Sequence, residues 1–261
     1  MILEEIAQRT RERIEAEKKQ CPPEELRRRA EEMKKEGAPS FARALLKEGI
    51  SFICEVKKAS PSKGVIAEDF PYRKIAMEYE QAGASAISCL TEPFYFQGKD
   101  EYLKEISESV SIPILRKDFT IDSYMIYQAK CLGASAVLLI CAILSDEELL
   151  EYRQIAEGLG LDALVETHDE AEVERAIRQG ARIIGVNNRN LKDFTVDVEN
   201  SIRLRSLVPK ECLFVSESGI KNAQDIERLR GNGTDAVLIG ETLMRRKDKK
   251  QALQELAGEV K

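Results

Sequence analysis

The sequence predicts an α/β fold, a closed (β/α)8 TIM barrel with an N-terminal helical extension. Eight short apolar runs recur along the 261 residues, and amphipathic stretches with helical spacing separate them. Most runs are continuously apolar, as expected for parallel strands covered on both faces. The tetrapeptide Gly-Ala-Ser-Ala occurs at 83–86 and again at 133–136, which indicates repeated units. The alternative, a doubly wound dinucleotide-binding sheet, lacks its G-x-G-x-x-G signature after the first strand.

Each strand–helix unit has its own start and stop signals. Ser145 and Glu148 form the pattern of a capping box, and Asn222 is a candidate N-cap. Glycines at 83, 133, 160, 180 and 233 stand where helices should end before the next strand. The predicted strands are Phe52–Lys57, Ala86–Thr91, Pro113–Phe119, Ala136–Ile143, Asp162–Thr167, Ile183–Asn188, Leu213–Ser218 and Ala236–Glu241.

Residues 1–50 precede the first strand and have a helical pattern. Pro22 and Pro23 suit a helix start, and residues 37–39 (Gly-Ala-Pro) suit a break. Ile2, Ile6 and Ile14 mark a narrow apolar stripe, too small for a separate core. We therefore expect one domain over residues 1–261, in which a helix lies across one end of a barrel that begins near residue 51.

Composition excludes several functional classes. The net charge is -6 and the charges are dispersed, which argues against nucleic-acid or anionic-membrane partners. The longest apolar run, Ala136 to Leu144, is too short to span a bilayer, and the charged N-terminus has no secretory pattern. These features predict a cytoplasmic protein.

The reactive residue types narrow the chemistry. Six cysteines contain no C-x-x-C pair and are expected to be buried hydrophobes. His168 is the single histidine and no residue spacing fits zinc, so no metal site is expected, and proton transfers should fall mainly to Lys and Glu. We expect His168 to start a helix, because strand alternation turns it away from Glu166.

Charged and amide side chains stand where an apolar core would not place them, at the ends of predicted strands. In a barrel the carboxyl ends of the strands meet at one mouth, so such residues are candidates for catalysis. Period-two alternation puts Glu55 and Lys57 on one face and Cys54 and Val56 on the other. A core-only Glu55–Lys57 pair is less favoured, because burying such a pair is costly. The converging residues are Glu55, Lys57, Lys117, Glu166, Asn187, Arg189 and Glu217.

Glycine-containing turns after the last two predicted strands indicate a phosphate site. Ser218-Gly219 and Gly240-Glu241 occupy the positions where such barrels bind phosphate through backbone N–H groups. Residues 60–64, which contain serines, lysine and glycine, follow Lys57 and are expected to form a mobile lid.

These segments closely resemble the indole-3-glycerol phosphate synthase family. The resemblance covers nearly the whole chain and rests on six motifs. They are Cys-Glu55-Val-Lys57-Lys-Ala-Ser60-Pro-Ser-Lys-Gly, the loop Leu90 to Gly98, Leu-Arg-Lys117-Asp-Phe119, Leu-Val-Glu166-Thr-His, Val-Asn187-Asn-Arg189 and Ser-Glu217-Ser218-Gly-Ile. The departures are Asn190, where the family often has Asp, and Thr242, where it has Ser.

The resemblance implies ring closure, decarboxylation and dehydration of 1-(2-carboxyphenylamino)-1-deoxyribulose 5-phosphate in tryptophan biosynthesis, without a cofactor. It assigns the acid of ring closure to Lys117. Glu55, Lys57 and Glu166 share the remaining proton transfers, in an order that the sequence leaves open. It implies that the substrate is bound by Ser60, Asn187, Arg189, Glu217 and Ser218, with Phe96 and Phe119 against its ring. It also implies that Arg189 and Lys57 supply positive charge toward the carboxylate or phosphate of the substrate. Other tryptophan-pathway enzymes are candidate partners.

Two alternatives use the same features. Phosphoribosylanthranilate isomerase is a similar barrel, but its reaction needs one acid and one base, which fits the lysine-rich set and the N-terminal extension less well. A non-catalytic phosphate-binding barrel would keep Gly219 and Gly240 but would have no use for Lys117 and Glu166.

Overall fold

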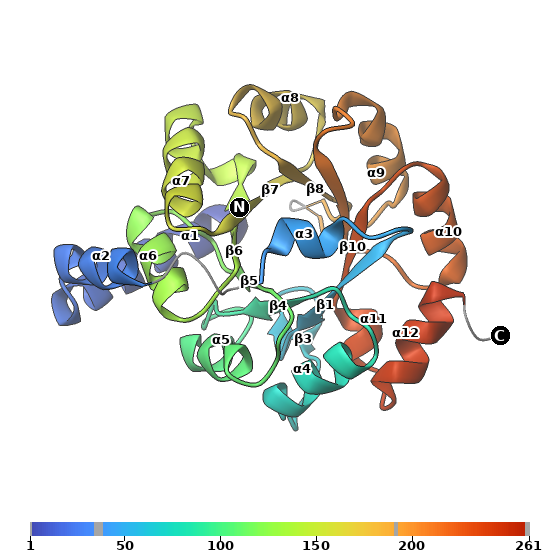
Figure 1. The fold of residues 1–261 in the computed structure, drawn as a ribbon, viewed down its shortest axis with the longest axis horizontal. Helices are drawn as coiled ribbons and strands as arrows, with labels where there is room; N and C mark the ends of the chain where they lie inside the picture. Colours follow the sequence, from blue (N-terminus) through green and yellow to red (C-terminus); the bar gives the residue numbers. More distant parts are fainter. Residues whose placement is uncertain (1, 34–38, 191–192, 259–261) are drawn as a thin grey trace.

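A closed barrel of parallel strands forms the centre of the molecule (Figure 1). The computed structural model describes residues 2–33, 39–190 and 193–258. Strand β10 pairs with β1, from Ser51 opposite Ala236 to Cys54 opposite Ile239, and closes the barrel. The predicted fold class is therefore confirmed. The barrel strands are β1 (Ser51–Val56), β4 (Ala86–Leu90), β5 (Ile114–Lys117), β6 (Ala136–Ile140), β7 (Asp162–Thr167), β8 (Ile183–Asn187), β9 (Leu213–Glu217) and β10 (Ala236–Ile239).

Helices surround the barrel and begin and end at the predicted signals. Ser145 and Glu148 form the capping box, and the Asn222 side chain accepts from the Asp225 N–H. In the described ranges no helix has the length and apolar character of a membrane-spanning segment. The helices that follow the strands are α4 (Tyr72–Gln81), α5 (Asp100–Ser107), α6 (Ser123–Cys131), α7 (Asp146–Gly158), α8 (Glu170–Arg178), α9 (Glu199–Leu204), α10 (Ala223–Gly231), α11 (Glu241–Met244) and α12 (Lys249–Ala257).

Several predicted strands are longer than the observed ones. Residues 141–143, predicted as the end of a strand, form the 3-10 helix η1 (Cys141–Ile143). The ladder between β6 and β7 ends at Ile140 opposite Glu166, after which the chain turns toward α7. The apolar run continues through this turn, where Cys141 and Leu144 are buried although Ala142 is exposed, so hydrophobicity alone did not locate the strand end.

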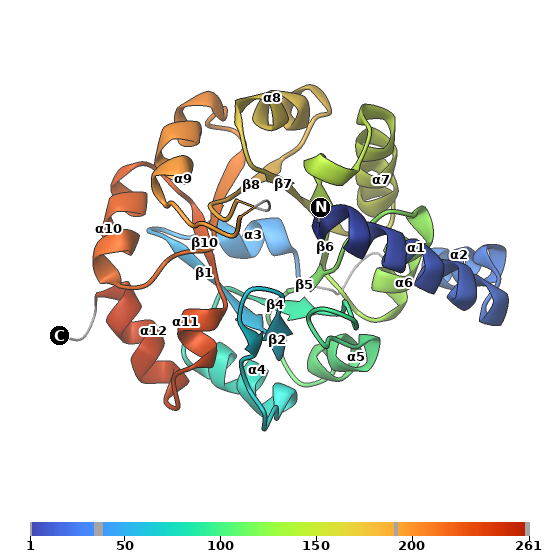
Figure 2. The ribbon, with the colours of Figure 1, turned by 180° about the vertical axis from the view of Figure 1, so that it is seen from behind.

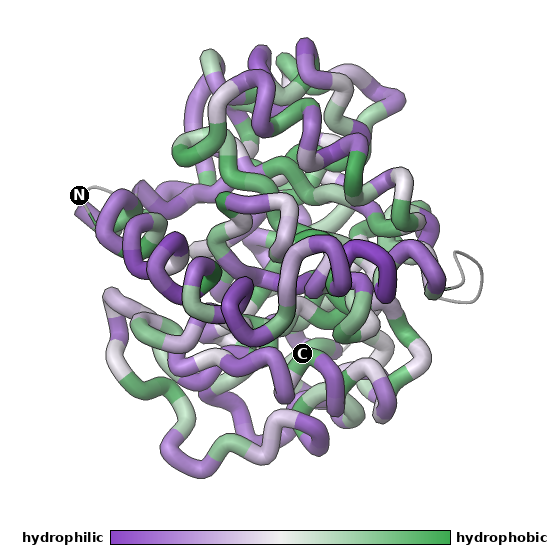
Figure 3. Tube along the Cα trace, turned by 90° about the vertical axis from the view of Figure 1, so that its left-hand side faces the viewer, coloured by the Kyte–Doolittle hydropathy of each residue, from purple (hydrophilic) through white to green (hydrophobic). Residues whose placement is uncertain are grey.

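Strand alternation divides the core into two layers. Ile53, Leu115 and Leu164 belong to the cluster that fills the barrel, whereas Cys54 and Val165 belong to the larger cluster between strands and helices. In Figure 3 the hydrophobic segments lie mainly toward the middle of the molecule and the hydrophilic ones on the outer helices. The predicted faces of the first strand, Cys54 outward and Glu55 inward, follow this division.

The N-terminal helices lie at opposite ends of the barrel. Helix α3 (Phe41–Leu45) closes the amino end of the strands, where Phe41 is fully buried and the Ala42 N–H donates to Asp162 Oδ2 at 2.9 Å. Helix α1 (Ile2–Gln20) lies across the other end, beside α2 (Pro23–Glu32) (Figures 1 and 2). The predicted break at 37–39 falls largely outside the described residues.

A buried carboxylate fastens α1 to the barrel. Asp118 Oδ2 lies 2.9 Å from Arg13 Nη2 and 3.6 Å from Arg116 Nη2, and accepts from Thr91 Oγ1 at 2.7 Å. Burial alone would raise the pKa of Asp118, but the guanidinium groups of Arg13 and Arg116 hold it below its ordinary value. Asp118 is therefore ionised, and it joins the N-terminal helix to the strand that ends in Lys117.

We expect Asp118→Asn to lower the free energy of unfolding by about 3–5 kcal/mol, because it leaves the largely buried Arg13 guanidinium without its nearest anion and removes one of the two carboxylates that Arg116 contacts. Denaturant unfolding at neutral pH measures this loss. The difference should begin to shrink as the pH falls below the unfolded-state pKa of Asp118, and should be lost as the pH falls through the lower folded-state pKa, where the carboxylate of the folded parent becomes neutral.

Asp122→Asn is the matched control. Asp122 is 29% exposed and pairs with Lys18 at 2.6 Å, so its loss should cost at most about 1 kcal/mol. Equal losses in the two variants would contradict the anchoring role of Asp118.

Candidate active site

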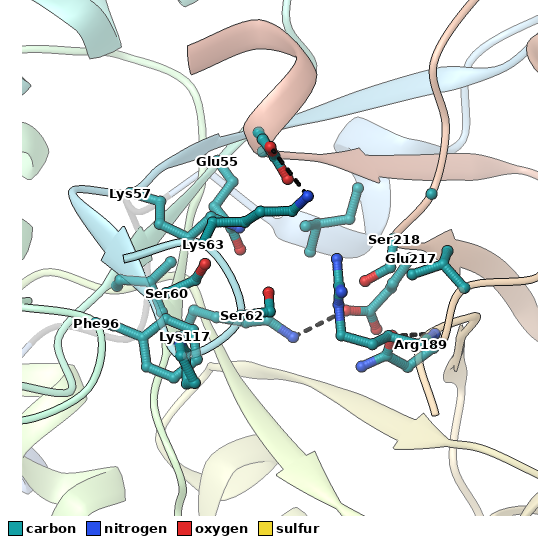
Figure 4. A pocket seen from close by; sticks show the side chains of 18 of the residues that line it. Glu55, Lys57, Ser60, Ser62, Lys63, Phe96, Lys117, Arg189, Glu217 and Ser218 are labelled. Carbon is teal, nitrogen blue, oxygen red and sulfur yellow. Dashed lines mark hydrogen bonds and ion pairs between the residues drawn. The ribbon is translucent and has the colours of Figure 1, made fainter. Parts of the chain in front are cut away.

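A cavity of about 590 Å³ opens at the carboxyl ends of the barrel strands. All the residues that the sequence predicted for the site line this one cavity (Figure 4). Their convergence is thus a structural fact, while their chemical roles stay predictions. They are Glu55, Lys57, Ser60, Phe96, Lys117, Phe119, Glu166, Asn187, Arg189, Glu217, Ser218, Gly219, Gly240 and Glu241.

Lys117 lies between two carboxylates. Its Nζ atom is 2.8 Å from Glu166 Oε2 and 2.8 Å from Glu217 Oε2. Burial alone would lower the pKa of Lys117, but these two neighbours raise it above its ordinary value. Burial would raise the pKa of Glu166, and the Lys117 ammonium instead holds it below its ordinary value. The pair is therefore an ammonium beside a carboxylate at neutral pH.

Glu217 differs from Glu166 in that its surroundings disfavour the ionised form. Burial, with the nearby charge of Glu166, raises the pKa of Glu217 to about 7 against the opposing effect of Lys117. Its Oε1 atom has no hydrogen-bond partner among the described residues. A Cβ atom at position 185 would lie 2.3 Å from that oxygen, so Gly185 leaves the space that the carboxylate occupies.

A second ion pair lies beside the predicted phosphate segment. Lys57 Nζ contacts Glu55 Oε1, and both atoms face Gly240. A Cβ atom at position 240 would lie 2.3 Å from Glu55 Oε1 and 2.8 Å from Lys57 Nζ. Ser218 and Gly219 follow β9 with positive φ angles of 70° and 83°, which turn the backbone toward the cavity. Glycine at 240 thus allows the backbone and the ion pair to share the same small space.

Asn187 connects the carboxylate of Glu166 to Arg189. Its Nδ2 atom donates to Glu166 Oε1 at 3.2 Å, and its Oδ1 atom accepts from the Arg189 N–H at 3.0 Å. Arg189 Nη1 donates to the Phe194 carbonyl at 3.3 Å. The Asn187 amide therefore holds the Glu166 carboxylate through its nitrogen and the Arg189 backbone through its oxygen.

One wall of the cavity is aromatic and rests on a buried glutamate. The Phe96 and Phe119 rings have centroids 6.0 Å apart at an interplanar angle of 41°. Glu92 is fully buried and accepts from the N–H groups of Phe94, Tyr95 and Phe96 at 2.7 to 2.9 Å. Glu92 was not predicted from the sequence, because it shapes the loop that presents Phe96 through contacts with backbone N–H groups.

Helix α1 supplies part of the wall. Ile2, Leu3 and Ile6 line the cavity. Sequence reasoning found the isoleucine stripe but did not connect it to the site. The sequence pattern predicted that a helix crosses one end of the barrel, but it did not indicate which end.

The expectation for the side chain of His168 was wrong. His168 Nε2 lies 3.4 Å from Glu166 Oε1, and Nδ1 lies 2.9 Å from Glu172 Oε2. Strand β7 ends at Thr167 and the chain turns into α8, so alternation does not extend to His168. The expected place before a helix is confirmed, because the His168 N–H donates to Glu172 Oε2 at 2.8 Å.

The segment after Lys57 folds into a small hairpin. Strands β2 (Ala59–Ser60) and β3 (Gly64–Val65) pair antiparallel. Lys63 is 47% exposed, and its Nζ atom lies 3.9 Å from Glu241 Oε1 across the cavity rim. The hairpin covers one side of the mouth, and its expected mobility stays a prediction.

The arrangement suits a ligand with an apolar ring and anionic groups. Cationic side chains of Lys57, Lys63, Arg189, Lys221 and Arg245 line the cavity, although Arg245 is paired with Glu241 at 2.9 Å. The inner ammonium of Lys117 can give a proton to a developing oxyanion, and Glu166 can accept one.

Comparison with known proteins places this chain among close relatives. The family profile described as Indole-3-glycerol phosphate synthase matches residues 3–256. The indole-3-glycerol phosphate synthase of Ruminiclostridium cellulolyticum is 56% identical, over 99% of both chains. That of Endomicrobium trichonymphae is 54% identical, over 98% of this chain and 99% of its own.

Solved structures with little sequence identity share the fold. The 3-hexulose-6-phosphate synthase of Salmonella typhimurium has a TM-score of 0.66 at 14% identity, over 80% of this chain and 97% of its own. The thiamine phosphate pyrophosphorylase of Pyrococcus furiosus has a TM-score of 0.62 at 17% identity, over 83% and 96%.

We expect Glu217→Gln to become more stable relative to the parent as the pH rises. The folded-state pKa of about 7 exceeds the ordinary glutamate value, so ionisation of Glu217 destabilises the folded parent as pH rises toward 7. Glutamine has no such titration. Denaturant unfolding of both proteins between pH 4.5 and 8 measures the difference, and a constant difference over this range would contradict the raised pKa.

Proposed function

The chain belongs to the indole-3-glycerol phosphate synthase family, and we propose that the cavity at its barrel mouth is where the family's reaction takes place. The function is the conversion of 1-(2-carboxyphenylamino)-1-deoxyribulose 5-phosphate to indole-3-glycerol phosphate, carbon dioxide and water in tryptophan biosynthesis. The observation that carries the site assignment is the Lys117 ammonium, buried between two carboxylates inside that cavity. The family match also disfavours the isomerase and non-catalytic alternatives.

The two ends of the substrate match two parts of the cavity. The phosphate binds at the backbone N–H groups of Ser218-Gly219 and Gly240-Glu241, near the Lys57 ammonium, which Gly240 closely approaches. The anthranilate ring packs on Phe96 and Phe119, and its carboxylate faces Arg189. Ser60 and Asn187 complete the polar lining. This orientation places the sugar ketone over the inner carboxylates and Lys117.

Ring closure uses Lys117 as an acid. The ring carbon that bears the carboxylate attacks the ketone, a carbon–carbon bond forms, and the carbonyl electron pair becomes an alkoxide. Lys117 gives this oxygen a proton and becomes neutral. The bond to the carboxylate then breaks, its electron pair returns to the ring system, and carbon dioxide leaves. Before donation, the carboxylates of Glu166 and Glu217 keep Lys117 charged.

Dehydration uses the other groups. The new hydroxyl leaves as water when Lys57 protonates it, and a carbon-bound proton passes to Glu166 to form the indole double bond. Glu55 contacts Lys57 and positions its ammonium, whereas Glu217 orients the substrate. This division makes Lys117 the acid of carbon–carbon bond formation, Lys57 the acid of carbon–oxygen bond cleavage, and Glu166 the base.

Three further expectations stay proposals. They are one domain over residues 1–261 with a helical extension over 1–50, a cytoplasmic location, and association with other enzymes of the tryptophan pathway. Separation of cell fractions and co-purification address the last two.

Formation of the indole chromophore tests the function directly. Incubation with the anilino-sugar phosphate should produce indole absorbance and carbon dioxide, and we expect Lys117→Met to lower kcat by ~10²–10⁴-fold because it removes the acid of ring closure. Near-normal turnover in this variant would refute the role of Lys117. Lys221→Met, which removes another lysine that lines the cavity but has no assigned step, is the control for the loss of positive charge.

We expect the hairpin at residues 60–64 to close over the ligand. Replacing Pro61 and Ser62 with glycine should change kcat and KM together, because a looser hairpin would exclude water less well. Stopped-flow kinetics in solvents of graded viscosity measure closure and product release. Identical kinetics for parent and variant at every viscosity would show that the hairpin is a passive connector.

A further inference from the structure

His168 sits between two carboxylates on the outer side of the cluster. Its Nδ1 atom is 2.9 Å from Glu172 Oε2, and its Nε2 atom is 3.4 Å from Glu166 Oε1. A neutral imidazole donates from one nitrogen and only accepts at the other, and an ionised carboxylate cannot donate. Nε2 has no hydrogen-bond partner among the described residues, so its contact with Glu166 is an ion pair. An unprotonated Nε2 would turn its lone pair toward the Glu166 carboxylate, whereas a ring protonated on both nitrogens, an imidazolium, is attracted to both anions.

The surroundings retain this charge. The His168 side chain is 17% exposed. Burial would lower the pKa of His168, but Glu166 and Glu172 raise it to about 10. The charged and titratable groups that interact with this pair of carboxylates include Lys117 from β5, Cys141 from η1, Arg175 from α8 and Glu217 from β9, which shares the Lys117 ammonium with Glu166.

These neighbours do not replace the charge of His168. Arg175 is bound to Asp146 Oδ1 at 2.7 Å and to two carbonyls, and burial keeps Cys141 a neutral thiol by raising its pKa to about 12. The Asn200 side chain from α9 donates to the backbone carbonyl of His168, at 3.0 Å, and not to its ring. Among the residues that the structure describes, Lys117 and His168 are thus the two cations that contact Glu166.

The two cations contact different oxygens of Glu166. Lys117 faces Oε2 and His168 faces Oε1, an oxygen that also accepts from Asn187. When Lys117 gives its proton to the substrate alkoxide, its charge disappears from beside Glu166. A buried carboxylate without a cation would take up a proton, and would then be unable to act as a base.

We propose that His168 is a positioning residue whose imidazolium, held by Glu172, keeps Glu166 ionised while Lys117 is neutral. The proposal rests on the proposed function, since it concerns the step at which Lys117 acts as an acid. His168 acts through Glu166 and is not among the residues that line the cavity within the described part of the chain. Its loss should therefore change kcat and the pH profile more than KM.

The charge of His168 can be observed directly. Because the chain has a single histidine, protein labelled with nitrogen-15 histidine and carrying no added histidine tag gives one imidazole spectrum. We expect both ring nitrogens to remain protonated at pH 8 in the parent. Glu172→Gln keeps an acceptor but removes the anion, and should lower the pH at which His168 loses its proton by about one unit or more. Glu174→Gln, on the exposed face of the same helix, should leave that pH unchanged.

The pH dependence of kcat/KM tests the effect on Glu166. A cation beside a carboxylate lowers its pKa, so its removal raises the pH below which Glu166 is protonated. We expect His168→Gln to move the acid limb of the profile upward by about one unit, a ~10-fold loss on that limb, with KM within about two-fold of the parent. Glu172→Gln should move the same limb in the same direction, and Glu174→Gln should not move it.

The outcomes separate the two proposals. An active parent whose His168→Gln and Glu172→Gln variants keep the parental acid limb would overturn the role of His168 alone. A histidine that is neutral at pH 8 in the parent spectrum would overturn it as well, and this arm does not depend on activity. A parent that forms no indole would refute the proposed function itself.

Discussion

The buried charges at the barrel mouth must balance, and this constraint organises the site. Glu55, Glu166 and Glu217 face the ammonium groups of Lys57 and Lys117, so the carboxylates outnumber the ammonium groups. Burial and this excess negative charge together raise the pKa of Glu217. Glu166 in turn contacts the imidazole of His168. An ammonium surrounded in this way cannot lose its proton to water easily, but a substrate alkoxide that enters the cluster is a stronger base than water. In the proposed reaction, the same excess of carboxylates keeps Lys117 protonated as the acid and supplies Glu166 as the base.

The end of β5 shows how one strand serves both the site and the scaffold. Lys117 points into the barrel, whereas Arg116 donates to the Met125 carbonyl and to Asp100 Oδ1 outside it. Asp118 then binds Arg13 of the N-terminal helix. Each residue of this short segment has a fixed partner, so the position of the Lys117 ammonium is set by contacts on three sides. Catalytic geometry here depends on packing between the barrel and a helix that precedes it in the chain.

The sequence was sufficient for the repeating features and insufficient for the local turns. Strand alternation placed Glu55 and Lys57 on the inner face, and the barrel topology brought Lys117, Glu166, Asn187 and Glu217 to one mouth. Alternation applies only while the chain stays extended, so it failed at His168 and at residues 141–143, where the backbone leaves the strand. Glu92 escaped notice for another reason, since its partners are backbone N–H groups that leave no trace in the sequence pattern.

The position of α1 sets an order of events during synthesis of the chain. Arg13 and Asp118 are separated by 105 positions, and Lys18 and Asp122 by 104. The helix is translated before its partners, and although Phe94 and Tyr95 contact it earlier in the chain, the two carboxylates that pair with Arg13 and Lys18 come only after β5. Closing so long a loop also carries a larger entropy cost than local pairing. Ile2, Leu3 and Ile6 therefore cannot take their places in the cavity wall until the first half of the barrel exists, and a nascent chain shorter than this presents the helix's apolar stripe to its surroundings.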